Sequence, residues 1–208
     1  MKEHYLYDIP VFVVDDLVTP EINIGEMCQE IKYTVPRGLL EDIEAIYFGE
    51  FPELENKNAI YADGAIYITN QEPTLFDILE NFYHELAHSL EERYGAFIFD
   101  KPLEDEFLGK RHRLKSLLDN EEYRMPAQYF KNIKYSKAFD KYLADVVGYP
   151  KLVNLTMGLF VSPYGATSLQ EYFANGFENY LLGDAKLVKD VSPVLYSKIE
   201  SIVNDNRD

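Results

Sequence analysis

The sequence predicts an α+β fold, with its strands in the first third of the chain and its helices after them. Three observations support this class. Segments rich in β-branched and aromatic residues are concentrated before residue 71. Two alternating runs in 59–70 flank Asp63-Gly64, a dipeptide typical of tight hairpin turns. After residue 72, apolar side chains recur at the three- and four-residue spacing of an amphipathic helix.

The N-terminal part is expected to form a small mixed sheet. Residues 6–14 (LYDIPVFVV) and 43–51 (IEAIYFGEF) have the composition of strands, and 59–70 (AIYADGAIYITN) has that of a hairpin. Between the first two strands, the mixed pattern of 20–35 is interpreted as a helix. The predicted hairpin directly precedes the longest helical pattern of the chain.

That long helix is predicted over residues 72–95. Thr74 and Asp77 have the spacing of a capping box, and Gly95 is the expected end. The apolar residues at helical spacing are Leu75, Ile78, Leu79, Phe82 and Leu86.

The rest of the chain is expected to be helical. Residues 96–160 are interpreted as a helical insertion, and helices are predicted at 168–184, ending at Gly183, and at 192–205. Because no linker or low-complexity run divides the chain, we expect one domain over residues 1–208.

The charge of the chain restricts its partners. With 36 acidic and 20 basic residues, the formal net charge is −16 and the pI is about 4.6. Such a chain repels nucleic acid phosphates and anionic membranes, so neither is an expected partner. Neutral or basic substrates would be attracted, although the acidity also agrees with a simple role in solubility.

The expected location is a reducing compartment. Cys28 is the single cysteine, which excludes an intramolecular disulfide and a cysteine-rich metal site. The first residues lack the apolar run of a signal peptide, and no segment is long enough to span a membrane. We expect a soluble cytoplasmic protein or, for a virus- or phage-encoded chain, one of the host cytoplasm or the virion.

The segment NFYHELAHSLEE contains the pattern His84-Glu85-x-x-His88. On a helix, residues four apart lie on one face, as two ligands of one metal ion must. The chain has only four histidines, and two of them are in this motif. The alternative is a pair of histidines with ordinary hydrogen-bond partners.

A catalytic zinc ion needs a third protein ligand. The extended pattern, with glycine and histidine six and ten residues after His84, is absent, and His4 and His112 are poorly placed. A carboxylate from a later helix is therefore expected, and Glu171 in an aromatic context is the candidate. Ser168 and Glu171 also have capping-box spacing, which leaves a purely structural role for Glu171 open. The pair Thr167 and Gln170 offers the same cap one residue earlier, which would release Glu171 from that role.

Two blocks, HELAHSLEERYG (84–95) and YGATSLQEYFANGF (164–177), resemble the catalytic domain of the anthrax lethal factor family of zinc metalloproteases. That family also includes the Pro-Pro endopeptidases. The resemblance covers roughly 43–183, but only the two blocks are specific. It implies a zincin-like fold and one Zn²⁺ per chain. The implied ligands are His84, His88 and Glu171; Glu85 would be the general base, and Tyr164 would face the reacting group.

The resemblance has two departures. Asn175 stands where many glutamate-type zincins have an acidic residue that orients a ligand histidine, and Glu178 is the alternative one turn further. The segment between the two blocks is also long. We further expect the alternating hairpin, in particular Ala65, Ile66 and Tyr67, to align a substrate through main-chain pairing.

The implied function is zinc-dependent hydrolysis of peptide bonds in a peptide or protein substrate. The alternative is a catalytically silent zincin-fold protein with a binding or structural role, such as a component of a viral or phage assembly.

Overall fold

The computed structural model describes residues 1–55 and 57–207, and it confirms the predicted α+β class. The chain forms two compact units. The first consists of Met1–Arg93 with Ser201–Asp208, and the second of Tyr94–Glu200. No helix in the described part of the chain combines the length and apolar character needed to cross a membrane.

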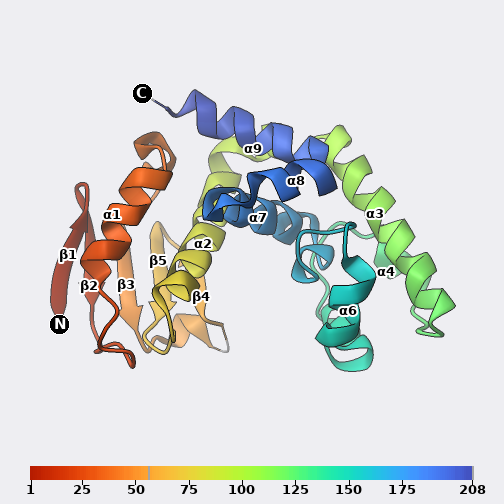
Figure 1. Cartoon of the computed structure of the whole chain (residues 1–208), viewed down its shortest axis with the longest axis horizontal. Coiled ribbons are helices and arrows are strands. Elements are labelled where there is room, and N and C mark those ends of the chain that lie inside the picture. Colours follow the sequence, from red (N-terminus) through yellow and green to blue (C-terminus); the bar gives the residue numbers. More distant parts are fainter. Residues whose placement is uncertain (56, 208) are drawn as a thin grey trace. The chain divides into compact units, whose positions relative to one another are not determined.

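The first unit contains a five-stranded mixed sheet (Figure 1). The outer pairs β1–β2 and β4–β5 are antiparallel, whereas β2, β3 and β5 run parallel to one another. The strands, in their order across the sheet, are β1 (Lys2–Leu6), β2 (Ile9–Val13), β3 (Ala45–Gly49), β5 (Ala65–Thr69) and β4 (Ala59–Ala62). Strand β4 is therefore an edge of the sheet.

Helices α1 (Ile24–Thr34) and α2 (Leu75–Ile98) lie over one face of this sheet in Figure 1. The covered face is fully apolar, and its residues are at most 4% exposed: Val11, Val13, Ile46, Phe48, Ile66 and Ile68. Alternate residues of the same strands form a stacked aromatic row on the other face. The alternation along the strands thus gives the sheet one apolar face, and α2 contacts β4 through the bond from the Tyr61 amide to Glu85.

Two predictions for this unit need correction. The segment 6–14 is not one strand. It contains the end of β1, a turn at Tyr7-Asp8 and strand β2, and Tyr7 in the turn has a positive φ of 56°. Gly95 does not end α2, which continues to Ile98. The start of α2 agrees with the prediction, because the Asp77 amide donates to Thr74 Oγ1 at 3.1 Å. The hairpin at Asp63-Gly64 is also confirmed, with φ values of 49° and 79°.

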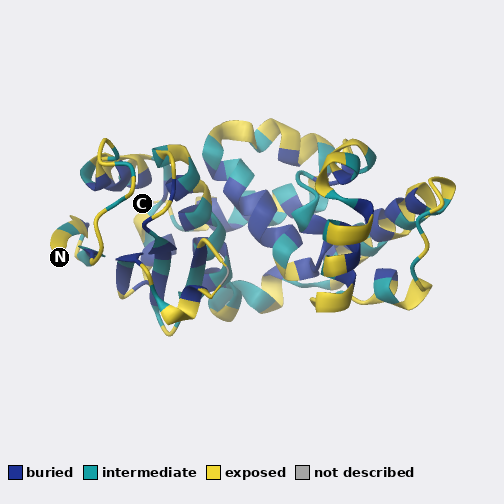
Figure 2. Cartoon of the chain, turned by 90° about the horizontal axis from the view of Figure 1, so that it is seen from below, coloured by how far each residue is buried: buried dark blue, intermediate teal, exposed yellow. Residues whose placement is uncertain are grey.

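The second unit is helical throughout its regular elements. Between residues 101 and 156 it contains α3 (Lys101–Asn120), α4 (Ala127–Lys131), α5 (Lys137–Lys141), the π-helix η3 (Tyr142–Val147) and α6 (Tyr149–Thr156). Later come η4 (Tyr164–Ala166), α7 (Leu169–Asn179), η5 (Tyr180–Asp184), α8 (Ala185–Val191) and α9 (Pro193–Asp205), of which the residues from Ser201 on belong to the first unit. Its core combines buried aliphatic residues with buried aromatic side chains, among them Phe107, Phe130, Phe139, Tyr172, Phe173 and Phe177. Figure 2 shows buried residues on the inward sides of these helices and exposed residues on their outward turns.

The helix predicted at 168–184 ends at Gly183, whose φ of 99° is incompatible with a continued helix. Ser168 is the N-cap of α7, since its hydroxyl accepts the Glu171 amide at 3.1 Å. Thr167 is not the cap, because its hydroxyl donates to the carbonyl of Tyr164. Helix α8, which follows Gly183, was not predicted.

Candidate metal centre

The two motif histidines face each other on consecutive turns of α2. The Nε2 atoms of His84 and His88 are 3.3 Å apart, and both side chains are half-buried. Two nitrogen ligands at about 2.0–2.1 Å from a tetrahedral zinc ion are separated by about 3.3 Å. The separation of the two imidazoles therefore fits a shared ion, and the sequence prediction of one common face is confirmed.

The orientation of His88 is fixed by a residue that the sequence analysis missed. His88 Nδ1 lies 2.7 Å from Glu91 Oε1. A proton on Nδ1 that is donated to this carboxylate leaves the Nε2 lone pair directed towards His84 and available to a metal ion. The signal was present in the sequence, because Glu91 follows His88 by three residues and so lies on the same helical face.

Glu85 lies beside β4, the edge strand of the sheet. Its Oε2 accepts the main-chain N–H of Tyr61 in β4 at 2.7 Å. In the two-residue hairpin, Ala62 and Ala65 form the hydrogen-bonded pair next to the turn, so the polar groups of Tyr61 point away from β5. Glu85 is thus held at a sheet edge that has main-chain groups directed outwards.

The sheet order corrects the expectation for Ala65, Ile66 and Tyr67. These residues belong to β5, which pairs with β3 on one side and with β4 on the other. A strand bonded on both sides has no main-chain groups left for a substrate. In the described part of the sheet, β4 pairs with β5 alone, and on its outer side the N–H of Tyr61 already donates to Glu85.

In the second unit, Tyr164 and Glu171 are presented by neighbouring elements. The Tyr164 carbonyl accepts the amide of Thr167 at 3.0 Å and its hydroxyl at 2.8 Å, which closes the turn η4 in front of α7. Burial raises the pKa of Tyr164, and the negative charge of Glu171 raises it further. The phenol therefore stays protonated at neutral pH and is able to donate a hydrogen bond.

Asn175 and Glu178, the proposed histidine-orienting residues, are both buried on α7. The Asn175 side-chain oxygen accepts the hydroxyl of Ser162. Glu178 accepts the side-chain amide of Asn179 at 3.3 Å. Each of the two side chains therefore has at least one hydrogen-bond partner within the second unit.

A second tyrosine lies near Tyr164 and was not predicted. Tyr135 donates to Asp140 Oδ2 at 2.7 Å, and this bond raises its pKa to about 12, with burial and the charge of Glu171 contributing. Tyr135 comes from the connection between α4 and α5. No local pattern marks it, because its position depends on how the helices of this unit fold together.

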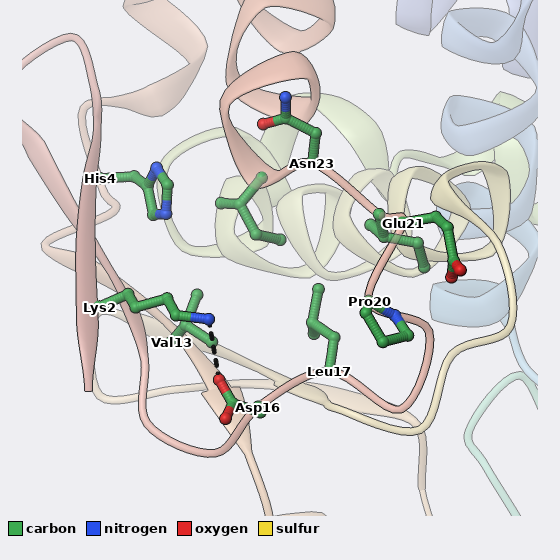
Figure 3. Close-up of a pocket in the computed structure, with 10 residues that line it drawn as sticks. Lys2, His4, Val13, Asp16, Leu17, Pro20, Glu21 and Asn23 are labelled. Carbon is green, nitrogen blue, oxygen red and sulfur yellow. Dashed lines mark hydrogen bonds and ion pairs between the residues drawn. The ribbon is translucent and has the colours of Figure 1, made fainter.

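The other two histidines are placed elsewhere. His112 is exposed on α3. His4 lies on β1 at a cavity of about 540 Å³, beside the ion pair between Lys2 and Asp16 at 2.9 Å (Figure 3).

Comparison of the chain with protein-family models, with curated proteins and with solved structures gives no match. Function is therefore inferred from the residues of the chain and from their geometry.

Proposed function

We propose that the chain is a zinc-dependent endopeptidase of the zincin type. In this proposal His84, His88 and Glu171 hold one Zn²⁺, Glu85 is the general base, and Tyr164 stabilises the developing negative charge. The observation that carries the proposal is the His84–His88 pair, whose facing Nε2 atoms adjoin a glutamate at the edge of a sheet.

The chemistry of the donor set fits zinc. Two imidazole nitrogens and one carboxylate oxygen, all from half-buried side chains, make up a common protein ligand set of catalytic zinc sites. When bound, such an ion supplies Lewis acidity, which lowers the pKa of water and polarises a carbonyl group. The bond from His88 Nδ1 to Glu91 supports the same role, because ligand histidines normally donate their second N–H to a carboxylate or carbonyl.

Glu85 is suited to proton transfer. It follows His84 directly on α2, so its side chain projects about 100° away around the helix and leaves the metal face to the histidines. The bond from Tyr61 fixes one carboxylate oxygen. The other oxygen would take a proton from the attacking water and later pass it to the leaving amine.

Tyr164 would stabilise charge. Hydrolysis of a peptide bond places negative charge on the carbonyl oxygen in the transition state, and a fixed O–H donor lowers the energy of that state. The raised pKa of Tyr164 keeps the proton on the phenol.

The edge strand β4 would hold the substrate. An extended peptide can add to a free edge by main-chain hydrogen bonds, which give affinity with little dependence on sequence. The carbonyl of Tyr61 points away from β5 on this edge, and the N–H of the same residue donates to Glu85. A peptide bound there would pass the general base.

Zinc content and peptide cleavage test the proposal together. We expect one zinc ion per chain in the wild type, near-complete loss in Glu171→Ala, and retention in Glu85→Gln with cleavage abolished. Mass spectrometry gives the metal stoichiometry, and a peptide library gives cleavage. Zinc at full occupancy in Glu171→Ala would place the third ligand elsewhere. Zinc in the wild type without cleavage of any peptide would favour a silent zincin fold.

A further inference from the structure

Arg111 on α3 is a fully buried cation that the proposed chemistry does not use. It is 1% exposed, and in the described part of the chain its guanidinium contacts backbone carbonyls and no carboxylate. One terminal nitrogen, Nη1, donates to the carbonyls of Ala166 at 2.7 Å and Thr167 at 3.2 Å. The other, Nη2, donates to those of Tyr129 and Asn132.

A buried charge without a counter-charge is strongly unfavourable, so its partners need an explanation. Burial lowers the pKa of Arg111 to about 9, which still leaves it protonated at neutral pH. The ring of Phe139 lies 4.2 Å from the guanidinium carbon and offsets part of the lost hydration through a cation–π contact. The planar guanidinium is the one side chain that can gather four carbonyls from two separate segments.

The two segments meet at the start of α7. Ala166 and Thr167 lie between Tyr164 and Glu171, and the amide of Leu169 donates to the carbonyl of Ile133 at 2.8 Å. The guanidinium and this backbone bond therefore join 129–133 to 166–169. A shift of the carbonyls at 166 and 167 would move the turn that carries Tyr164 and the first turn that carries Glu171.

We propose that Arg111 is a positioning residue for Tyr164 and Glu171, which it fixes through the carbonyls of Ala166 and Thr167. This inference rests on the proposed function, because it gives Arg111 a role in zinc binding and transition-state stabilisation as well as in folding.

Lys110 provides a matched comparison for a purely structural role. It is also a buried cation of α3, and its amine donates to the carbonyls of Leu159 at 2.8 Å and Val191 at 2.6 Å. Those carbonyls lie outside the 164–171 segment. The Lys110 amine also lies 5.7 Å from the ring centre of Tyr172, one residue after this segment. Lys110→Met should therefore destabilise the protein but accelerate exchange in 164–171 less than Arg111→Met does, and Arg113→Met, at an exposed position on the same helix, should change neither property.

The experiment measures amide hydrogen exchange in 164–171, zinc release to a chelator, and the separate values of kcat and KM. Arg111→Met should accelerate exchange in this segment and weaken zinc binding by about 10- to 100-fold, as loss of a ligand-orienting group does. It should lower kcat more than it changes KM. Arg111→Lys keeps the charge but not the planar fork, so its exchange rate and zinc affinity should lie between those of the wild type and those of Arg111→Met. It also provides a measurable variant if Arg111→Met does not fold.

If both Arg111 variants show the same exchange and the same zinc release as Lys110→Met, the inference is overturned. The proposed zinc site is not affected by that result. A wild-type protein that binds no zinc would instead overturn the proposed function. In that case, faster exchange of 164–171 in the Arg111 variants than in Lys110→Met still supports the positioning role of Arg111. Exchange equal to that of Lys110→Met overturns this role.

Discussion

At the scale of single residues, His88 shows how one helix can orient an imidazole. Its two ring nitrogens have different partners: Nδ1 faces Glu91 at 2.7 Å and Nε2 faces His84 at 3.3 Å. All three residues come from one helix, so their relative positions follow from helical geometry alone.

The first prediction concerns Glu91. Glu91→Gln replaces a charged acceptor by a neutral one, which lowers the basicity of the His88 ring and loosens its orientation. We expect zinc affinity to fall by about 10- to 100-fold, measured by competition with a chelator of known affinity. Glu92→Gln is the control, because Glu92 is adjacent but exposed. Equal zinc affinities in the two variants would show that Glu91 does not support a metal ligand.

The second prediction concerns Tyr164. Tyr164→Phe removes a hydroxyl but preserves the ring, so His84, His88 and Glu171, the proposed ligands, are unchanged and a single hydrogen-bond donor is lost. We expect the rate of peptide hydrolysis to fall by about 100- to 1,000-fold, with zinc content unchanged. Tyr135→Phe is the comparison, because its phenol is already bonded to Asp140, and its effect should be smaller. A larger loss of rate in Tyr135→Phe would transfer the role to that residue.

The facing of His84 and His88 was predictable from the sequence because both residues lie on one helix. His84, Glu85 and His88 are contiguous, and helical periodicity alone predicts which of them share a face. The contact of Glu85 with the amide of Tyr61 was not predictable in this way, because it requires the position of a strand against a helix.

At the scale of elements, local patterns predicted the types of element better than their pairing. The hairpin at Asp63-Gly64 was predictable because a type I′ turn needs two residues with positive φ. The position of β5 inside the sheet was not predictable from the sequence. Its parallel pairing with β3 joins two strands that are not adjacent in a hairpin, and such pairing leaves no periodic signal in the sequence. For this reason the prediction that Ala65, Ile66 and Tyr67 pair with a substrate through their main chain was wrong.

The third prediction concerns the start of α9. Glu106 on α3 accepts the amides of Val194 at 2.9 Å and Leu195 at 3.1 Å, and also the hydroxyl of Tyr172 at 2.9 Å. It thereby satisfies donors that a helix leaves unpaired at its N-terminus. Glu106→Ala should lower the free energy of unfolding by about 1–3 kcal/mol, measured in urea.

The control for that prediction is Asp105→Ala, at an exposed neighbouring position of α3. Exposed substitutions of this kind usually change stability by no more than about 0.5 kcal/mol. A loss in Glu106→Ala no larger than in Asp105→Ala would mean that solvent satisfies the first amides of α9 equally well.

At the scale of the whole molecule, the absence of a compositional break has a structural explanation. The two units divide between Arg93 and Tyr94 and again between Glu200 and Ser201, positions that lie inside α2 and α9. The chain therefore passes from one unit to the other through helices and needs no glycine- or serine-rich linker, so composition alone does not mark the division.

The last prediction follows from the net charge of −16, which belongs to the chain as a whole. A field of this sign attracts cationic substrates and repels anionic ones, and salt screens it: the Debye length falls from about 30 Å at 0.01 M to about 3 Å at 1 M. For three peptides with one scissile sequence and basic, neutral or acidic flanks, kcat/KM should be highest for the basic peptide at low salt. Its advantage should shrink as salt rises, and the neutral peptide should change least. An advantage that persists at 1 M salt would assign the preference to contacts at the site, because the long-range field would by then be screened.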